Sequence, residues 1–84
     1  MIRVTIIGLG FVGLSFASFL GSKGISVIGV DSNKKKIECL REGLPDFYEP
    51  KLEYYLKKGI KNIIFTSKID ETTLQSDFIF ITVG

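Results

Sequence analysis

Short apolar runs alternate with amphipathic stretches along this chain, and that pattern predicts strands alternating with helices. Four runs are rich in β-branched and aromatic residues and stop at glycine or at polar residues, as buried strands do. They cover residues 3–7, 25–30, 63–66 and 78–83. The last run has no polar alternation, which is expected for a strand covered on both faces.

The first two connecting segments show helical spacing. Residues 12–23 repeat apolar side chains every three or four positions, and Gly24 follows as a C-terminal cap. A second helix is expected to begin near Ser32 or Asn33, since either side chain can cap it. Its apolar stripe is narrow, so most of this helix should be exposed to solvent; the stripe consists of Ile37, Leu40 and Leu44.

Two further helical segments are expected before the last strand. Pro50 suits the first position of a third helix, where its missing N–H costs no hydrogen bond, and Gly59 follows as its cap. Residues 70–75 are expected to hold one helical turn, with Leu74 facing inward. The buried face of the third helix is predicted to consist of Leu52, Tyr55 and Leu56. The aromatic core is predicted to contain Phe16, Phe19, Phe65, Phe78 and Phe80.

Strands that alternate with helices form a parallel sheet with right-handed crossovers. The predicted strand order is third, second, first, fourth, with helices on both faces. The fold class is therefore α/β, a partial Rossmann-type doubly wound parallel sheet of about four strands. The 84 residues have room for one domain, and a domain of this size is marginally stable because it buries only about 60% of its unfolded surface.

Composition narrows the function mainly by exclusion. A net charge of +2 without a clustered basic face does not favour nucleic-acid binding. No run reaches the ~18 apolar residues of a membrane span, and the first residues lack the form of a signal peptide, so a soluble cytoplasmic domain is expected. The chain has no histidine, and Cys39 as a single cysteine makes neither an internal disulfide nor a metal site. We therefore expect no catalytic and no metal-binding residues.

Three glycines lie between the first predicted strand and the first predicted helix. Gly8, Gly10 and Gly13 form a G-x-G-x-x-G sequence. Gly8 permits a tight turn, Gly10 leaves room for a pyrophosphate, and Gly13 lets the helix pack closely on the sheet. The free N–H groups at the helix start would then hold the phosphates. The same sequence is also compatible with a tight turn that binds nothing, but its strand–turn–helix context favours a dinucleotide site.

An acidic residue supports that interpretation. Asp31 ends the second predicted strand, 18 residues after Gly13, close to the spacing of the dinucleotide fingerprint. Its carboxylate would accept hydrogen bonds from the adenine-ribose hydroxyls and repel a 2′-phosphate, which favours NAD over NADP. It could instead only cap the following helix. A solvated charge run is the simpler interpretation of Lys34 and Lys35, whereas Lys36 is open to both a ligand role and a surface role.

Four segments follow a pattern that is more specific than the glycines alone: residues 6–14, 27–36, 48–50 and 76–84. In this pattern Asp31 is followed five residues later by Lys36, and Tyr48 begins a Tyr-Glu-Pro sequence at the third-helix start. Together the segments resemble the UDP-glucose/GDP-mannose dehydrogenase family over the whole chain. Two positions depart from it, since Phe11 stands where the family usually has Tyr and Lys51 where it usually has Gly. For Tyr48 and its neighbouring Glu, loop packing and a helix-start carboxylate are favoured over ligand contact.

The resemblance implies NAD as cofactor and a nucleotide-sugar 6-dehydrogenase as the parent enzyme. Such an enzyme, like UDP-glucose 6-dehydrogenase in polysaccharide biosynthesis, oxidises a primary alcohol to a carboxylate with two NAD. Residues 1–84 would be the N-terminal part of its NAD-binding Rossmann domain, without the catalytic and substrate domains, so this chain alone is predicted to be inactive. The implied NAD contacts are Gly8, Gly10, Phe11, Val12, Gly13, Asp31, Lys36, Val83 and Gly84.

Two other functions would use the same turn and acid. One is a stand-alone dinucleotide-binding regulatory module, and the other is the cofactor half of a 3-hydroxyacid-type dehydrogenase. In either case the strand at 78–83 would present an unpaired and very apolar edge. Such an edge pairs readily with another chain, so self-association through the fourth strand is expected.

Overall fold

The structure is a computed structural model that describes residues 1–82 of the chain. Its four strands form one parallel sheet in the order β3-β2-β1-β4, which confirms the predicted topology. The strands, in chain order, are β1 Arg3–Ile7, β2 Ser26–Val30, β3 Ile63–Thr66 and β4 Phe78–Ile81. The helices are α1 Phe11–Ser22, α2 Lys34–Arg41, α3 Pro50–Gly59 and α4 Glu71–Leu74, and a 3-10 turn, Ile60–Asn62, precedes β3.

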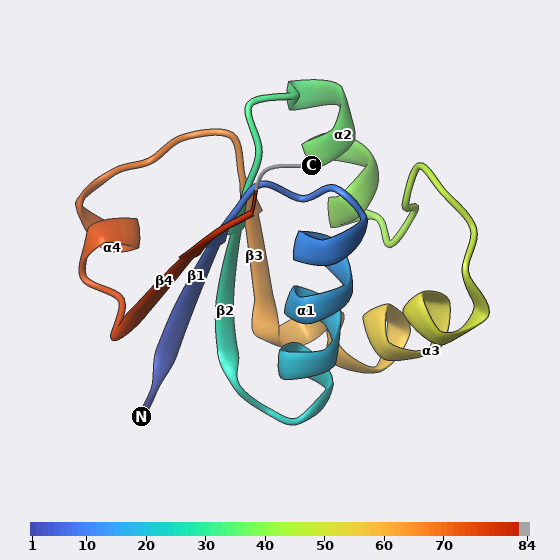
Figure 1. Cartoon of the computed structure of the whole chain (residues 1–84), viewed down its shortest axis with the longest axis horizontal. Helices are drawn as coiled ribbons and strands as arrows, with labels where there is room; N and C mark the ends of the chain where they lie inside the picture. The colour runs from blue at the N-terminus through green and yellow to red at the C-terminus, as the bar shows by residue number, and fades with distance from the viewer. Residues whose placement is uncertain (83–84) are drawn as a thin grey trace.

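The helices lie on both faces of the sheet. Figure 1 shows α1, α2 and α3 on one face and α4 on the other. The core lies between the sheet and the first three helices, and α1 packs on both α3 and β2. It is built from alternate strand residues and the inward faces of the helices, including Val4, Ile6, Leu14, Val27, Leu40, Leu56 and Phe65. This arrangement leaves the carboxyl ends of all four strands at one edge, next to the first turn of α1.

Sequence cues account for where several helices begin and end. The side chain of Asn33 caps α2 by accepting a hydrogen bond from the amide of Lys36. Pro50 occupies the first position of α3, and Glu49 caps it through Leu52 N at 2.7 Å. After α1 the chain turns through Gly24 at a φ of +86°, a left-handed conformation that favours glycine. These features match the predicted helix boundaries within a residue or two. Gly59, however, is the last helical residue of α3 at a φ of −104°, and Ile60 rather than Gly59 is the C-cap.

Two predicted inward-facing leucines are in fact exposed. Leu74 is 63% exposed, because the capping box formed by Asp70 and Thr73 fixes the short α4 with Thr73 as its buried residue. The hydroxyl of Thr5 in β1 also donates a hydrogen bond to the carbonyl oxygen of Thr73. Leu44 is 58% exposed because α2 ends at Arg41, so the predicted helical stripe does not reach it.

The aromatic core is smaller than predicted. Phe65 is buried and Phe16 packs partly against the core, but Phe19, Phe78 and Phe80 are each at least 41% exposed. Phe19 lies on the outer side of α1 against the half-buried Tyr55 of α3. The other two belong to β4, which is an edge strand whose four residues are all exposed, so the prediction of a strand covered on both faces is wrong for the described residues. β4 ends at Ile81, and the last predicted strand residue, Val83, lies outside those residues.

Candidate dinucleotide site

The glycine turn after β1 is fixed by close backbone contacts. Gly8 has a φ of +100° and donates its amide to Val30 O in β2 at 2.8 Å. A Cβ atom at Gly8 would collide with the carbonyl oxygen of Thr82, and one at Gly13 would collide with the carbonyl oxygen of Gly8. Among residues 1–82, a Cβ at Gly10 would meet no atom within 4 Å. Gly8 and Gly13 are therefore required by the fold, whereas the space at Gly10 is open to a ligand.

The first turn of α1 presents backbone amides to that open space. Its first intrahelical hydrogen bond runs from Leu14 N to Gly10 O at 2.9 Å, so the three preceding amides lie outside the helical ladder. Gly10, the N-cap, supplies no side-chain acceptor, and the first turn contains no acidic residue. Phe11 and Val12, the first two helical residues, are 58% and 68% exposed. Uncapped amides at a helix N-terminus favour an anion, so this turn fits a pyrophosphate.

Asp31 lies directly after β2, beside the glycine turn. Its Oδ2 accepts the amide of Leu9 at 2.9 Å, and its Oδ1 accepts the amide of Asn33 at 2.9 Å. Burial raises the pKa of Asp31, but these two amides and the charge of Lys36 outweigh it, so the pKa lies below its ordinary value. The group is a carboxylate at neutral pH, as an acceptor for ribose hydroxyls must be. The side chain of Asn33, not that of Asp31, caps α2.

Lys36 extends from α2 back towards the turn. Its Nζ lies 3.2 Å from Leu9 O, 3.9 Å from Asp31 Oδ2 and 3.5 Å from Asp46 Oδ2. Only 16% of its side chain is exposed, whereas Lys34 and Lys35 are exposed. The structure therefore brings the predicted aspartate–lysine pair together and separates Lys36 from the two solvated lysines. Asp46, in the loop between α2 and α3, was not predicted.

Thr82 completes the turn from the other side and was also not predicted. Its hydroxyl donates to Gly8 O at 2.7 Å, and its amide donates to Ile7 O at 2.8 Å. A cleft of about 280 Å³ lies at this end of the sheet, lined in part by Gly8, Asp31 and Thr82. The cleft lies at the carboxyl ends of the central strands, where open α/β sheets bind their ligands. Val83 and Gly84, predicted as further contacts, lie outside the described residues.

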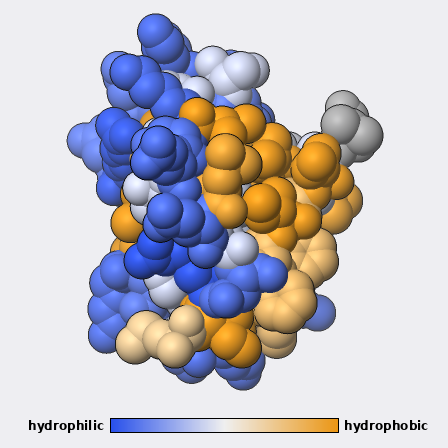
Figure 2. All heavy atoms as spheres, turned by 90° about the vertical axis from the view of Figure 1, so that its left-hand side faces the viewer, coloured by the Kyte–Doolittle hydropathy of each residue, from blue (hydrophilic) through white to orange (hydrophobic). Residues whose placement is uncertain are grey.

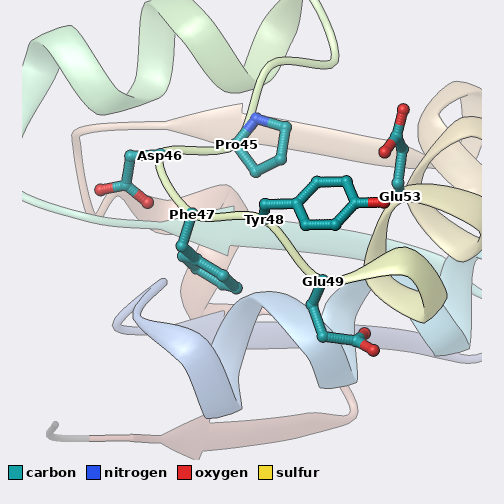
Figure 3. A pocket seen from close by; sticks show the side chains of 6 residues that line it. All are labelled: Pro45, Asp46, Phe47, Tyr48, Glu49 and Glu53. Carbon is teal, nitrogen blue, oxygen red and sulfur yellow. The ribbon is translucent and has the colours of Figure 1, made fainter.

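The loop between α2 and α3 borders the same region. Phe47 packs on Phe11 with their ring centroids 5.3 Å apart, and Figure 3 shows Phe47 directed towards α1, with Asp46 on the opposite side of the loop from Tyr48 and Glu53. The loop itself forms an open pocket of about 380 Å³ whose lining runs from Pro45 to Glu53. Tyr48 is 78% exposed and Glu49 caps α3, which agrees with the structural interpretation of that carboxylate.

Comparison with known proteins assigns the chain to a family. Residues 2–84 match the UDP-glucose/GDP-mannose dehydrogenase family, NAD binding domain. The chain belongs to this family. It is 38% identical over 84 residues to GDP-mannose 6-dehydrogenase of Pseudomonas aeruginosa and 36% identical over 84 residues to UDP-glucose 6-dehydrogenase of Rickettsia conorii, covering 98% of this chain in each case.

Solved structures of the family share the fold. A ternary complex of GDP-mannose dehydrogenase from Pseudomonas aeruginosa superposes with a TM-score of 0.89 at 38% identity, covering 99% of this chain and 20% of that one. A UDP-glucose dehydrogenase from Pyrobaculum islandicum superposes with a TM-score of 0.88 at 34% identity, again covering 99% and 20%. The chain spans about a fifth of the length of its relatives: 20% of each of these two solved chains, and 19% of each of the two enzymes named in the preceding paragraph.

The family match and the geometry agree on the cofactor. The match is to an NAD-binding domain, and the open position at Gly10, the uncapped first turn of α1 and the ionised Asp31 fit a dinucleotide. NAD is therefore the cofactor of this domain. Among the described residues no helix has the length and apolarity needed to cross a bilayer.

Proposed function

We propose that the chain binds NAD through the glycine turn, the start of α1 and the Asp31–Lys36 pair. The pyrophosphate would lie over Gly10 and accept hydrogen bonds from the amides of Phe11, Val12 and Gly13. The adenine ribose would lie beside Asp31, whose carboxylate accepts from its hydroxyls, with Lys36 at its edge. The main support is the contrast among the three glycines: the two required by the fold flank one whose side-chain space is open. Val83 and Gly84 remain proposed contacts on the nicotinamide side.

We propose further that the parent protein is a nucleotide-sugar 6-dehydrogenase. Enzymes that act on GDP-mannose and on UDP-glucose match the chain at nearly equal identity, which supports the class of substrate without separating its members. Bound NAD would supply the hydride acceptor. Oxidation of a primary alcohol to a carboxylate removes two hydrides and takes its second oxygen from one water, so two NAD are reduced and three protons are released for each sugar. The carboxylated nucleotide sugar would serve polysaccharide biosynthesis in the cytoplasm, and the catalytic and substrate domains would lie outside residues 1–84.

Binding and activity are tested separately. Calorimetric titration of the purified chain with NAD and with NADP should give the tighter binding for NAD. The complete reading frame that contains this chain should then be expressed and supplied with UDP-glucose and with GDP-mannose. Two NADH per nucleotide sugar consumed would support the dehydrogenase. Binding of NAD by a complete product that oxidises neither sugar would contradict oxidation of these two substrates and favour a regulatory module or a 3-hydroxyacid-type dehydrogenase instead.

We also propose that the 84-residue chain self-associates through β4. All four β4 residues are exposed and apolar, and β4 forms one edge of the sheet. Figure 2 looks onto the side of the molecule that carries α4 and β4 and shows a continuous apolar surface there. An apolar edge strand without lysine or proline favours pairing with another strand.

A further inference from the structure

The loop between α2 and α3 contributes a second carboxylate to the ribose end of the site. Asp46 Oδ2 lies 3.5 Å from Lys36 Nζ, closer than Asp31 Oδ2 at 3.9 Å. The third neighbour of this ammonium group is the carbonyl oxygen of Leu9 at 3.2 Å. Lys36 therefore donates a hydrogen bond to Leu9 O, and its charge is shared between two carboxylates at ion-pair distance.

The two carboxylates differ in what else they do. Asp31 is 17% exposed and holds the backbone amides of Leu9 and Asn33, so it is part of the turn. Asp46 is 56% exposed, and Lys36 is its partner in a groove of about 340 Å³ beside the first turn of α2. Asp46 thus acts on the site through Lys36 and through its own charge.

The charges of Asp31, Lys36 and Asp46 determine whether a 2′-phosphate at this position would be attracted or repelled. Asp31 and Lys36 alone would sum to zero, and a flexible lysine next to the ribose could turn towards a phosphate and neutralise it. With Asp46 the three groups sum to −1, and the lysine is already held by two carboxylates. A dianionic phosphate at this position would therefore meet a net negative site and an engaged cation.

We propose that Asp46 is a specificity-determining residue that strengthens the preference for NAD over NADP by holding Lys36 and adding negative charge beside the ribose. This inference rests on the proposed NAD site. It predicts an effect on NADP that exceeds the effect on NAD, because the ribose hydroxyls of NAD bind to Asp31 and carry no charge. Half-exposed ion pairs are weak, so the expected change in the preference is about two- to fivefold.

The test is the Asp46→Asn variant, titrated with NAD and with NADP by calorimetry. We expect NADP to bind about two to five times more tightly and NAD to change by less than about twofold. Glu53→Gln is the matched control, since it removes the same charge from an exposed residue of α3. It should leave the preference unchanged. In a Lys36→Gln background, Asp46→Asn should change the preference less, because the lysine that it releases is gone.

The outcomes separate the two proposals. If wild type and Asp46→Asn both bind NAD and show the same NAD-to-NADP ratio, Asp46 has no role in specificity while the NAD site stands. An equal change in the Glu53→Gln control would mean that net charge alone is responsible, which also overturns the role of Asp46. If the wild-type chain does not bind NAD at all, the proposed site fails and the specificity role fails with it.

Discussion

The amide of Leu9 donates to Asp31 Oδ2 over 2.9 Å, so the acid at the end of β2 holds the middle of the glycine turn. The other carboxylate oxygen accepts the amide of Asn33 at the start of the next helix. One side chain therefore fixes the two backbone segments that would surround the adenosine end of NAD. Asp31 therefore contributes both to stability and to the proposed NAD site, so a substitution at this residue should affect both.

Replacing Asp31 by alanine should weaken NAD binding and also destabilise the domain. The ligand loses a charged acceptor, for which we expect about 10- to 100-fold weaker binding. The free energy of unfolding should fall by about 1–3 kcal/mol, because the amide of Leu9 loses its partner in a half-buried turn. Calorimetry and urea unfolding measure the two effects. Asp31→Asn keeps an acceptor oxygen and should lose less stability, and equal losses in both variants would contradict the role of the hydrogen bonds.

The same carboxylate makes stability depend on acid. The pKa of Asp31 is lower in the folded chain than in the unfolded chain, where it is about 3.9. Its contribution to stability is therefore complete above about pH 5, one unit above the unfolded-state pKa, and is lost as the pH falls through the lowered folded-state pKa. Urea unfolding at neutral pH and below pH 4 should show this loss. The Asp31→Asn variant should lose less stability over the same pH range; an identical pH profile would exclude Asp31 as a source of acid sensitivity.

Alanine substitutions in the glycine turn should separate folding from binding. Gly10→Ala adds a methyl group that meets no atom of the described residues within 4 Å, at a φ of −74° that alanine tolerates, so stability should change by less than about 1 kcal/mol. The methyl group would lie where the pyrophosphate approaches, so NAD binding should fall at least about tenfold. Gly13→Ala instead forces Cβ into the carbonyl of Gly8 and should cost more than about 2 kcal/mol. Thermal unfolding with and without NAD distinguishes the two. Unchanged NAD affinity in Gly10→Ala would contradict the proposal that the pyrophosphate lies over this turn.

Features that depend on neighbours in the sequence could be predicted. The strand order follows from the alternation of strands and helices, and the cap at Asn33 and the turn at Gly24 follow from residue types with one strong local preference. The pairing of Asp31 with the glycine turn follows from a known spacing between two strand ends. In each case a local or periodic rule constrains the geometry.

Features that depend on contacts between distant segments could not. α1 and α3 approach each other closely at Gly21 and Gly59, where a Cβ on Gly59 would run into the backbone of α1. The sequence marks Gly59 only as a helix cap and gives Gly21 no role. Thr82 reaches the site from the position directly after β4 and Asp46 from a loop, and neither belongs to the glycine–aspartate motif. Leu74 is exposed because the Asp70 cap, and not the apolarity of Leu74, determines which face of α4 is buried.

The isolated chain should show no dehydrogenase activity even when NAD is supplied. The chain has no histidine to act as a general base for its single cysteine, and that cysteine, Cys39, is half-buried on α2. Incubation with NAD and UDP-glucose, or with GDP-mannose, should therefore produce no NADH above a sample without protein. A full-length relative serves as the positive control. Sustained NADH formation that persists after further purification of the chain would show that residues 1–84 contain catalytic groups.

Self-association through β4 should depend on the polarity of its outer edge. Ile81 is 71% exposed at the end of this strand, and its three neighbours in β4 are exposed as well. A lysine there places a charge where a second chain would pair, and edge lysines are a common defence against such pairing. At micromolar concentration the sedimentation coefficient of the wild-type chain should rise with concentration, and that of Ile81→Lys should not.

Leu44→Lys is the matched control, because Leu44 is 58% exposed in the loop after α2 and does not belong to β4. It should behave as wild type. A wild-type chain that sediments as a monomer throughout would mean that the β4 edge is protected against pairing in solution, and loss of association in both variants would place the contact elsewhere on the surface.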